Sequence, residues 1–262
     1  SVFKSIKMDF IELREIFRQK DPLLIEILNA IRTNTITDEH LELLNKRVNP
    51  HFEFDSLPRG CIILTTVNSR AEEINLQQLN RLNGETYTFH ASITGDFDER
   101  SFPADAVLHL KKGARVMLLN NDPFNRWING TLATVKECDK EEVVVSLDNG
   151  EEYAVYPYTW EIFRYRLNET KQLVAESVGT FTQLPLRLAW AITIHKSQGL
   201  TFDNAVIDLF RGIFAHGQLY VALSRCRTLD GITLTTPVKR KHIILDYRVC
   251  DFITRYQYQK IE

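Results

Sequence analysis

Two Asn-Gly dipeptides set among short apolar runs constrain the fold of this chain more than any other feature. Asn129-Gly130 and Asn149-Gly150 lie within residues 104–158, where the runs ARVMLL, TLATV, EVVVSL and EEYAVY follow one another. Runs of this length are typical of strands, and Asn-Gly supplies the positive φ angles of a type I′ hairpin turn. The segment therefore predicts a small antiparallel β barrel or sandwich.

Before that segment the sequence predicts helices. One is expected near residues 10–19, a second over residues 22–32, and a third from about residue 38. Asp21 suits the N-cap of the second helix, and Pro22 suits its first position, where a missing N–H costs nothing.

Strands and helices then alternate. Residues 61–66, CIILTT, predict a buried strand, and Ser69 with Glu72 predicts a capping box for a helix that ends at Gly84. After residue 185 the pattern resumes, with a strand at NAVIDLF and a helix at GQLYVALSRC. Alternation of this kind predicts an α/β domain, here interrupted by the β module.

Composition narrows the class of protein. The 262 residues are 44% hydrophobic and 25% charged, which is ordinary for a globular chain with one large or two modest domains. The four cysteines are widely separated, so neither a zinc knuckle nor a disulfide framework is indicated, and a reducing, intracellular setting is expected. The sequence contains no apolar stretch long enough to span a bilayer, and we expect no membrane partner.

Charge is unevenly distributed along the chain. Net charge is −2, yet residues 160–262 hold 14 Lys and Arg against 9 Asp and Glu, whereas residues 1–159 hold 18 against 25. Contacts with phosphate groups are therefore expected in the C-terminal part. Random variation of the surface explains the difference equally well.

The densest cluster of polar chemistry is Thr193-Ile-His-Lys-Ser-Gln-Gly199. Hydroxyls, an imidazole and an ammonium after an apolar strand, with free N–H groups at a helix start, suit the binding of an anion. A polar helix end that is merely solvated is the alternative, and spacing alone favours it.

A second candidate cluster runs from Gly217 to Arg227, GQLYVALSRCR. On a helix, Gln218 and Arg225 stand two turns apart and share a face. A guanidinium there suits a γ-phosphate, because it stabilises charge that develops during phosphoryl transfer. An arginine that pairs only with a surface carboxylate is the simpler interpretation of spacing alone.

These segments resemble conserved motifs of a known family. LPLRLAWAITIHKSQGLTFD, residues 184–203, closely resembles the fifth motif of Pif-type and RecD-type superfamily-one DNA helicases, and GQLYVALSRCR resembles the sixth. Residues 16–32 resemble the fourth motif and its following helix. GARVMLLNN and NGT resemble the entrance to the β insertion, called 2B, that interrupts the second RecA-like domain, called 2A.

The resemblance implies a particular fold. It is an α/β, RecA-like second motor domain of the P-loop NTPase type, lacking its own P-loop, with an inserted small SH3-like antiparallel β barrel. Domain 2A would comprise residues 1–105 and 176–262, and 2B would comprise residues 106–175. No glycine of the chain precedes a lysine, so a phosphate-binding loop is absent and the chain alone is not expected to hydrolyse ATP.

The resemblance also assigns roles to residues. The catalytic cations facing the γ-phosphate would be Arg225 and Arg18. Further ATP contacts would come from Gln218, Gly199 and Gln198. Contacts with DNA would come from Thr193, His195, Lys196, Ser197, Thr65, Thr66 and Asn68, although an ordinary strand end and N-cap explain the last three as well. Among the aromatic residues, Trp127, Trp160, Tyr156 and Tyr158 fit base stacking, and core or barrel packing fits them better.

Function and partners follow from the same resemblance. The chain would be the C-terminal motor half of an ATP-dependent, 5′ to 3′ DNA helicase that serves DNA repair or recombination. ATP and Mg²⁺ would be held mainly by an N-terminal RecA-like domain of the same polypeptide. Single-stranded DNA would be the other partner. The protein would be monomeric and intracellular, and in a bacterium cytoplasmic and nucleoid-associated. The alternative is a non-catalytic nucleic-acid-binding or adaptor module that keeps a helicase fold.

Overall fold

The computed structural model describes residues 17–54, 57–58, 60–140, 142–167, 172–210, 212–249 and 251–252. The chain divides into two compact units. The terminal unit comprises Ser1–Phe52 and Ile194–Glu262, and the central unit comprises Glu53–Thr193. The helix predicted near residues 10–19 lies mostly outside the described residues, and residues 17–20 are not helical.

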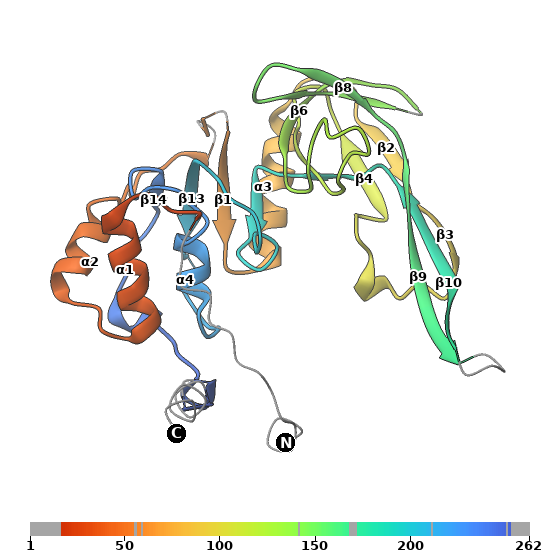
Figure 1. Ribbon diagram of the computed structural model, residues 1–262. Coiled ribbons are helices and arrows are strands. Elements are labelled where there is room, and N and C mark those ends of the chain that lie inside the picture. The colour runs from red at the N-terminus through yellow and green to blue at the C-terminus, as the bar shows by residue number, and fades with distance from the viewer. Residues whose placement is uncertain are drawn as a thin grey trace. The chain divides into compact units, whose positions relative to one another are not determined.

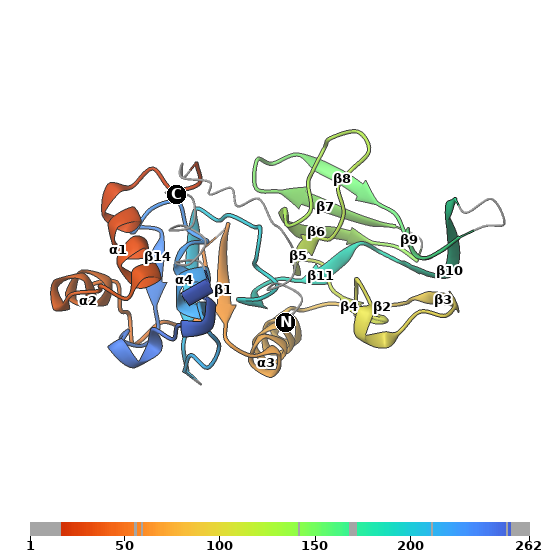
Figure 2. The same cartoon turned by 60° about the horizontal axis from the view of Figure 1, so that its bottom comes forward.

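The terminal unit combines helices with a pair of parallel strands. Its helices are α1 (Pro22–Thr33), α2 (Asp38–Asn45), the short α4 (Gln218–Leu223) and a 3₁₀ turn, η4 (Arg240–His242). Its strands are β13 (Asn204–Asp208) and β14 (Ile232–Leu234), which pair in parallel. Figures 1 and 2 show α1 beside β14 and α4 in this unit.

Helix α1 begins where the sequence predicts. The Asp21 side chain accepts hydrogen bonds from the backbone N–H groups of Leu23 and Leu24 at 3.0 and 3.3 Å. The helix ends at Thr33, and its C-cap Asn34 adopts a left-handed φ of 58°. Its buried face consists of Leu24, Ile27, Leu28, Ala30 and Ile31. Full burial of each large aliphatic side chain contributes about 1.5–3 kcal/mol and anchors α1 to the unit.

The central unit starts with a strand and a helix. Strand β1 (Cys61–Thr65) is fully buried and pairs in parallel with β12 (Ala191–Thr193). Helix α3 (Asn68–Arg81) is tied to β12 by Asn75, whose side chain bonds the Ala191 N–H and carbonyl, each at 2.8 Å.

The predicted capping box of α3 is wrong. The N-cap is Val67, which has no side-chain cap, and the helix ends at Arg81 rather than at Gly84. The Thr65 hydroxyl donates to the Val67 carbonyl at 3.0 Å, and this bond accompanies the extended conformation of Val67 and the early start of the helix.

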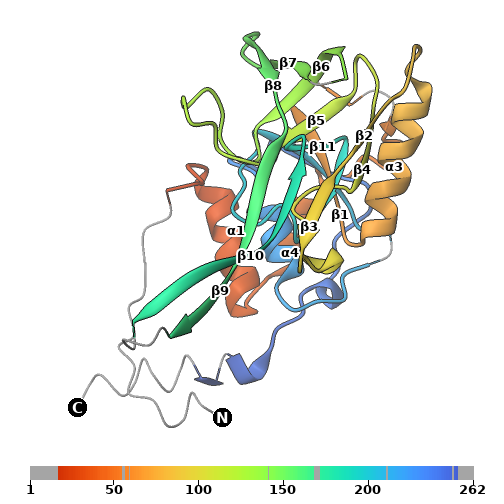
Figure 3. The same cartoon turned by 90° about the vertical axis from the view of Figure 1, so that its right-hand side faces the viewer.

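The rest of the central unit is antiparallel. Its strands are β2 (Tyr87–His90), β3 (Ser92–Gly95), β4 (Val107–Leu110), β5 (Arg115–Leu118), β6 (Leu132–Cys138), β7 (Val143–Leu147), β8 (Glu152–Val155), β9 (Tyr158–Leu167), β10 (Leu173–Gln183) and β11 (Leu186–Leu188), with a 3₁₀ turn, η3 (Glu99–Ser101), before β4. They form sheets in the orders β2-β4, β3-β10-β9 and β11-β5-β6-β7-β8. Figure 3 shows β9 and β10 as a long two-stranded ribbon. No helix in these stretches or elsewhere in the described chain is long and apolar enough to cross a membrane.

The two Asn-Gly sites lie in this antiparallel region, but neither forms the predicted type I′ turn. Asn149-Gly150 lies in a hairpin between β7 and β8 that is closed by a 2.8 Å bond from the Leu147 N–H to the Glu151 carbonyl. Only the glycine there has a positive φ, of 89°. Asn129-Gly130 lies near the end of a long connection between β5 and β6, over residues 119–131. In longer hairpin loops a single left-handed glycine is sufficient.

Candidate functional site

Arg225 lies just beyond α4, not on it. The helix has six residues and ends at Leu223, with Ser224 as its C-cap, so the predicted two-turn spacing between Gln218 and Arg225 on one helix is wrong. The Arg225 side chain turns back instead. Its Nε donates to the Val221 carbonyl at 2.9 Å, and its Nη2 donates to the Ser224 hydroxyl at 2.7 Å.

The Arg225 guanidinium also reaches the turn after β12. Its Nη1 donates to the carbonyls of Leu200 at 3.2 Å and Ser197 at 3.4 Å. Four of its five N–H groups are therefore used, and within the described chain the fifth has no partner. Arg225 as a whole is only 6% exposed.

This buried cation has no acidic partner among the residues that the structure describes. Every hydrogen bond that Arg225 makes there goes to a neutral oxygen. Burial, followed by the neighbouring positive charge of Arg18, lowers the pKa of Arg225 to about 10. The guanidinium stays protonated at neutral pH, so the cluster carries a positive charge that an anion would stabilise.

Arg18 lies in a short segment that is attached to the Arg225 region. It is half-buried, and its neighbour Gln19 is 5% exposed. The Gln19 amide donates to the carbonyls of Ser224 at 2.7 Å and Cys226 at 3.1 Å. The charge of Arg18 is close enough to lower the pKa of Arg225, and their shared service of one site stays a prediction.

Gln218 is the first residue of α4 and follows Gly217, which has a left-handed φ of 69°. It is buried, and its Oε1 accepts from the Phe214 N–H at 3.3 Å. The amide therefore holds the loop before α4 in place in this structure.

The predicted helix start after β12 is a series of turns. Backbone bonds join Ser197 to Ile194 and Gln198 to His195, each at 3.2 Å. The Ser197 hydroxyl is fully buried and donates to the Ile194 carbonyl at 2.7 Å. The exposed residues of the segment are His195, Lys196, Gln198 and Gly199.

The other predicted DNA contacts lie in the central unit. Thr65 and Thr193 face each other at the ends of the parallel strands β1 and β12. Both are buried, as is Thr66, whereas Asn68 is exposed at the first turn of α3.

The aromatic residues divide between core and surface. Trp127 is buried, with its indole N–H donating to the Asn120 side chain at 3.2 Å. Trp160 lies 6.0 Å from the ring of the fully buried Phe181 and 4.8 Å from the ring of Tyr158, measured between ring centroids. These contacts fit the packing interpretation of both tryptophans, although Trp160 is half-buried. Tyr156 and Tyr158 are exposed.

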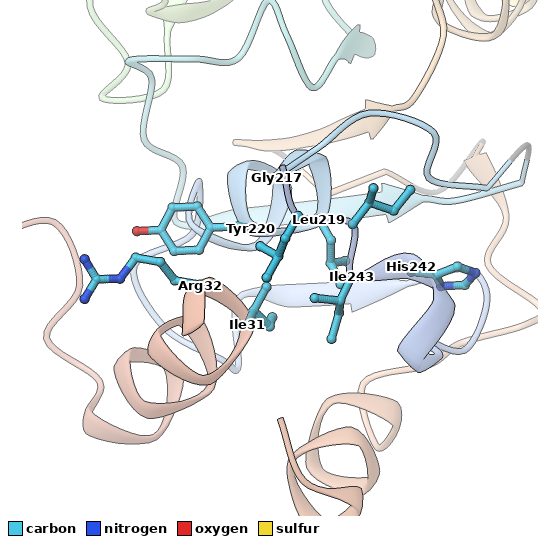
Figure 4. Close-up of a pocket in the computed structure, with 9 residues that line it drawn as sticks. Ile31, Arg32, Gly217, Leu219, Tyr220, His242 and Ile243 are labelled. Carbon is cyan, nitrogen blue, oxygen red and sulfur yellow. The ribbon is translucent and has the colours of Figure 1, made fainter. Parts of the chain in front are cut away.

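A small apolar pocket lies beside helix α4 in the terminal unit. It encloses about 130 Å³ and is lined by Ile31, Arg32, Gly217, Leu219, Tyr220, His242, Ile243, Ile244 and Leu245. Figure 4 shows Ile31, Leu219 and Ile243 meeting at its centre, with Arg32 directed away from it. Elsewhere, the described residues contain no group of three or more His, Cys, Asp or Glu placed to hold a metal ion.

Comparison with known proteins identifies the class of this arrangement. Residues 188–229 match the family model of the UvrD-like helicase C-terminal domain. That stretch contains the turns after β12, helix α4 and Arg225. The family model therefore covers Arg225 and most of the groups that contact its guanidinium. This stretch of the chain is therefore similar to the C-terminal domain of UvrD-like helicases.

Matches that cover most of the chain point to one kind of helicase within this class. The ATP-dependent DNA helicase Pif1 of Bdellovibrio bacteriovorus is 33% identical over 245 residues, which is 92% of this chain and 53% of the relative. A crystal structure of Bacteroides sp Pif1 in complex with ADP-AlF4 is 39% identical with a TM-score of 0.85, covering 98% of this chain and 59% of that one. Bacteroides Pif1 bound to ssDNA is also 39% identical, with a TM-score of 0.71 over 99% of this chain and 59% of that one.

The chain thus corresponds to the C-terminal half of Pif1-type helicases and has their α/β fold. It spans about half the length of the Bdellovibrio relative. The resemblance predicted from the motifs is confirmed across nearly the whole chain.

Proposed function

We propose that this chain is the C-terminal motor half of an ATP-dependent DNA helicase that moves 5′ to 3′. One observation carries the proposal. Arg225 is buried beside Arg18, and no carboxylate pairs with it in the part of the chain that the structure describes. Burying a guanidinium without an anion costs free energy, and a triphosphate would offset that cost. The relative that was solved in complex with ADP-AlF4 supports a nucleotide as the ligand.

In this proposal Arg225 and Arg18 are the catalytic cations. They stabilise negative charge on the γ-phosphate as it transfers, which a planar, permanently charged guanidinium does well. Gln218, Gln198 and Gly199 complete the nucleotide contacts from α4 and from the exposed turn after β12.

The proposed DNA track uses the polar residues at the ends of β1 and β12. In the terminal unit His195 and Lys196 are exposed and suited to phosphate contacts, and buried Ser197 holds their turn. In the central unit Thr65, Thr66, Asn68 and Thr193 would contribute. A single-stranded substrate is supported by the relative that was solved bound to ssDNA.

We assign residues 1–105 and 176–262 to a RecA-like domain 2A, and residues 106–175 to an SH3-like 2B insertion. The support for 2B is that most of the antiparallel sheet β11-β5-β6-β7-β8 comes from that range. The N-terminal RecA-like domain of the same polypeptide would supply the phosphate-binding loop and the Mg²⁺ ligands. The chain alone would then not hydrolyse ATP. We further propose a monomeric, intracellular protein that acts in DNA repair or recombination, and in a bacterium a nucleoid-associated one.

Replacement of Arg225 in the full-length protein tests the proposal. Arg225→Ala should lower ATP turnover by about a thousandfold or more, the magnitude of an arginine finger, with a much smaller change in nucleotide binding. Arg225→Lys should recover little, because an ammonium lacks the guanidinium fork.

Arg227 provides a matched control. It lies two residues further on and makes an exposed ion pair with Asp203 at 3.0 Å. Exposed pairs contribute little, so Arg227→Ala should leave both turnover and melting temperature nearly unchanged. A folded Arg225→Ala enzyme that turns over ATP at a near-normal rate would refute the proposal.

A further inference from the structure

Gln19 holds the backbone on both sides of Arg225. Its Nε2 donates to the Ser224 carbonyl at 2.7 Å and to the Cys226 carbonyl at 3.1 Å, and these residues immediately precede and follow Arg225. Because both acceptors are carbonyl oxygens, the end of the amide that faces them is the NH₂ group. Both of its hydrogens are used.

The Arg225 peptide is also bonded to the backbone of another segment. Its carbonyl accepts from the Phe202 N–H at 2.9 Å, and Phe202 and Cys226 form an isolated parallel bridge. The side chain of Gln19 thus adds two hydrogen bonds to the backbone bond that already holds this peptide. The Ser224 carbonyl is also one of the acceptors that a helix end leaves without an intrahelical partner.

A second bond fixes the same segment two residues later. Asp21 caps α1 with Oδ1, while its Oδ2 accepts from the Leu229 N–H at 2.8 Å. The chain from residue 19 to residue 21 is therefore attached at two points to residues 224–229. Arg18 adjoins the first of these points.

Arg18 and Arg225 carry like charges, which repel each other when they are brought together. Repulsion favours a wider separation unless rigid bonds resist it. The buried amide of Gln19, one residue from Arg18 and in contact with the peptides around Arg225, is placed to resist it.

We propose that Gln19 is a positioning residue that fixes Arg18 and Arg225 at the separation that the transferring phosphoryl group requires. This inference rests on the proposed function of the two arginines. Gln19 itself has no role here as a nucleotide ligand. It acts through the backbone of Arg225 and the location of Arg18.

Asn45 provides a control of the same chemistry. Its amide also joins an N-terminal helix to the C-terminal part of the terminal unit, donating to the Val238 carbonyl at 3.1 Å and accepting from the Val238 N–H at 2.8 Å. Both of these bonds go to Val238, and neither involves Arg18 or Arg225. Asn45→Leu should therefore lower the melting temperature with little effect on turnover.

The test compares Gln19→Met with Asn45→Leu in the full-length protein. For Gln19→Met we expect kcat for ATP to fall about ten- to hundredfold, the effect of misplacing a catalytic group by about 1 Å, with KM changed less than about threefold. Affinity for ADP should be unchanged, and affinity for ADP with aluminium fluoride should fall about tenfold or more. Gln19→Met should slow the Arg225→Ala enzyme by a smaller factor than it slows the wild type, because part of its effect acts through Arg225.

The inference is overturned if Gln19→Met lowers the melting temperature, as Asn45→Leu does, but leaves kcat and the affinity for ADP with aluminium fluoride at normal values. That result, together with an Arg225→Ala enzyme that is inactive, would leave the proposed function intact. An active Arg225→Ala enzyme would instead reject the proposed function itself.

Discussion

The Asp122 turn in the central unit supports a quantitative prediction about stability. Asp122 is 4% exposed, and its carboxylate accepts from the N–H of Phe124 at 2.8 Å and from Arg126 through Nε at 2.9 Å and Nη2 at 2.6 Å. A further bond from the Arg126 backbone N–H measures 3.2 Å. The Arg126 guanidinium lies over the Trp127 ring, 4.6 Å from its centroid.

Asp122→Asn should remove most of this arrangement while keeping the shape of the side chain. One carboxylate oxygen becomes an NH₂ group that faces the donors of Arg126, so at least one charge-assisted bond is lost and two donors are opposed. Charge-assisted bonds contribute about 1.5–3 kcal/mol each. A third of the Arg126 side chain is exposed, which lets water compensate in part, so we expect a loss of about 2–3 kcal/mol of unfolding free energy.

The loss should depend on pH in a defined direction. The side-chain bond from Arg126 is the main cause that lowers the pKa of Asp122 to about 2 in the folded state, against about 3.9 in an unfolded chain. The stability from a lowered pKa is fully present above about pH 4 and is lost as pH falls through about 2. The gap between the wild type and Asp122→Asn should therefore be widest near neutral pH and narrow in acid.

Urea unfolding followed by tryptophan fluorescence measures this gap, because Trp127 lies in the same turn and is buried. Curves at pH 7, 5 and 3 for both proteins give the difference at each pH. Glu99→Gln provides a control, since Glu99 lies in the exposed turn η3. A constant gap from pH 7 to pH 3, or no gap at pH 7, would refute the reasoning.

Substitutions at Gly231 and Asn34 test the backbone. Gly231→Ala should destabilise the protein by about 1–3 kcal/mol or more, because the added Cβ would lie 2.0 Å from the Asp203 carbonyl oxygen, and thermal unfolding should show a lower midpoint than for Gly212→Ala, where φ is +76° but the space is open. Asn34→Gly should leave the melting temperature unchanged or slightly raised, whereas Asn34→Ala should lower the unfolding free energy by about 1 kcal/mol, since Asn34 ends α1 at a φ of 58°. Equal midpoints for Gly231→Ala and wild type, or for the two Asn34 variants, would contradict these expectations.

Local signals were sufficient for some elements of the fold. Asp21 and Pro22 are adjacent to the helix that they start, and the α1 prediction is confirmed at that end. The α3 capping box failed because Val67, an extended residue without a polar side chain, occupies the N-cap. Its start depends on the strand before it, which a four-residue pattern does not include.

The turns show the same limit. Asn-Gly correctly marked the region between β7 and β8 as a hairpin, yet the length of the loop determined which residue took the positive φ. Loop length follows from how the flanking strands pair, and pairing is a property of the whole sheet.

The candidate site depends even more on distant contacts. The motif sequences predicted roles for Arg18 and Arg225, but Gln19 was missed although it follows Arg18 directly. Its two bonds go to residues that lie 205 and 207 positions further along the chain. The one available signal was its place beside Arg18 in the FRQ sequence, which gives no indication of what the amide contacts.

The two interpretations of Arg225, a surface ion pair or a phosphate-facing cation, could not be separated by sequence because both need only an arginine near polar neighbours. They differ in what surrounds the guanidinium. An ion pair requires a carboxylate within bonding distance, whereas the Arg225 guanidinium is surrounded by the carbonyls of Val221, Leu200 and Ser197 and by the hydroxyl of Ser224. Neutral oxygens orient a guanidinium without neutralising it, so within the described chain its charge is left for an anion. In the proposed role, a cation held in this way would need little reorganisation as charge develops on a phosphoryl group, which is the property that makes such a group effective in catalysis.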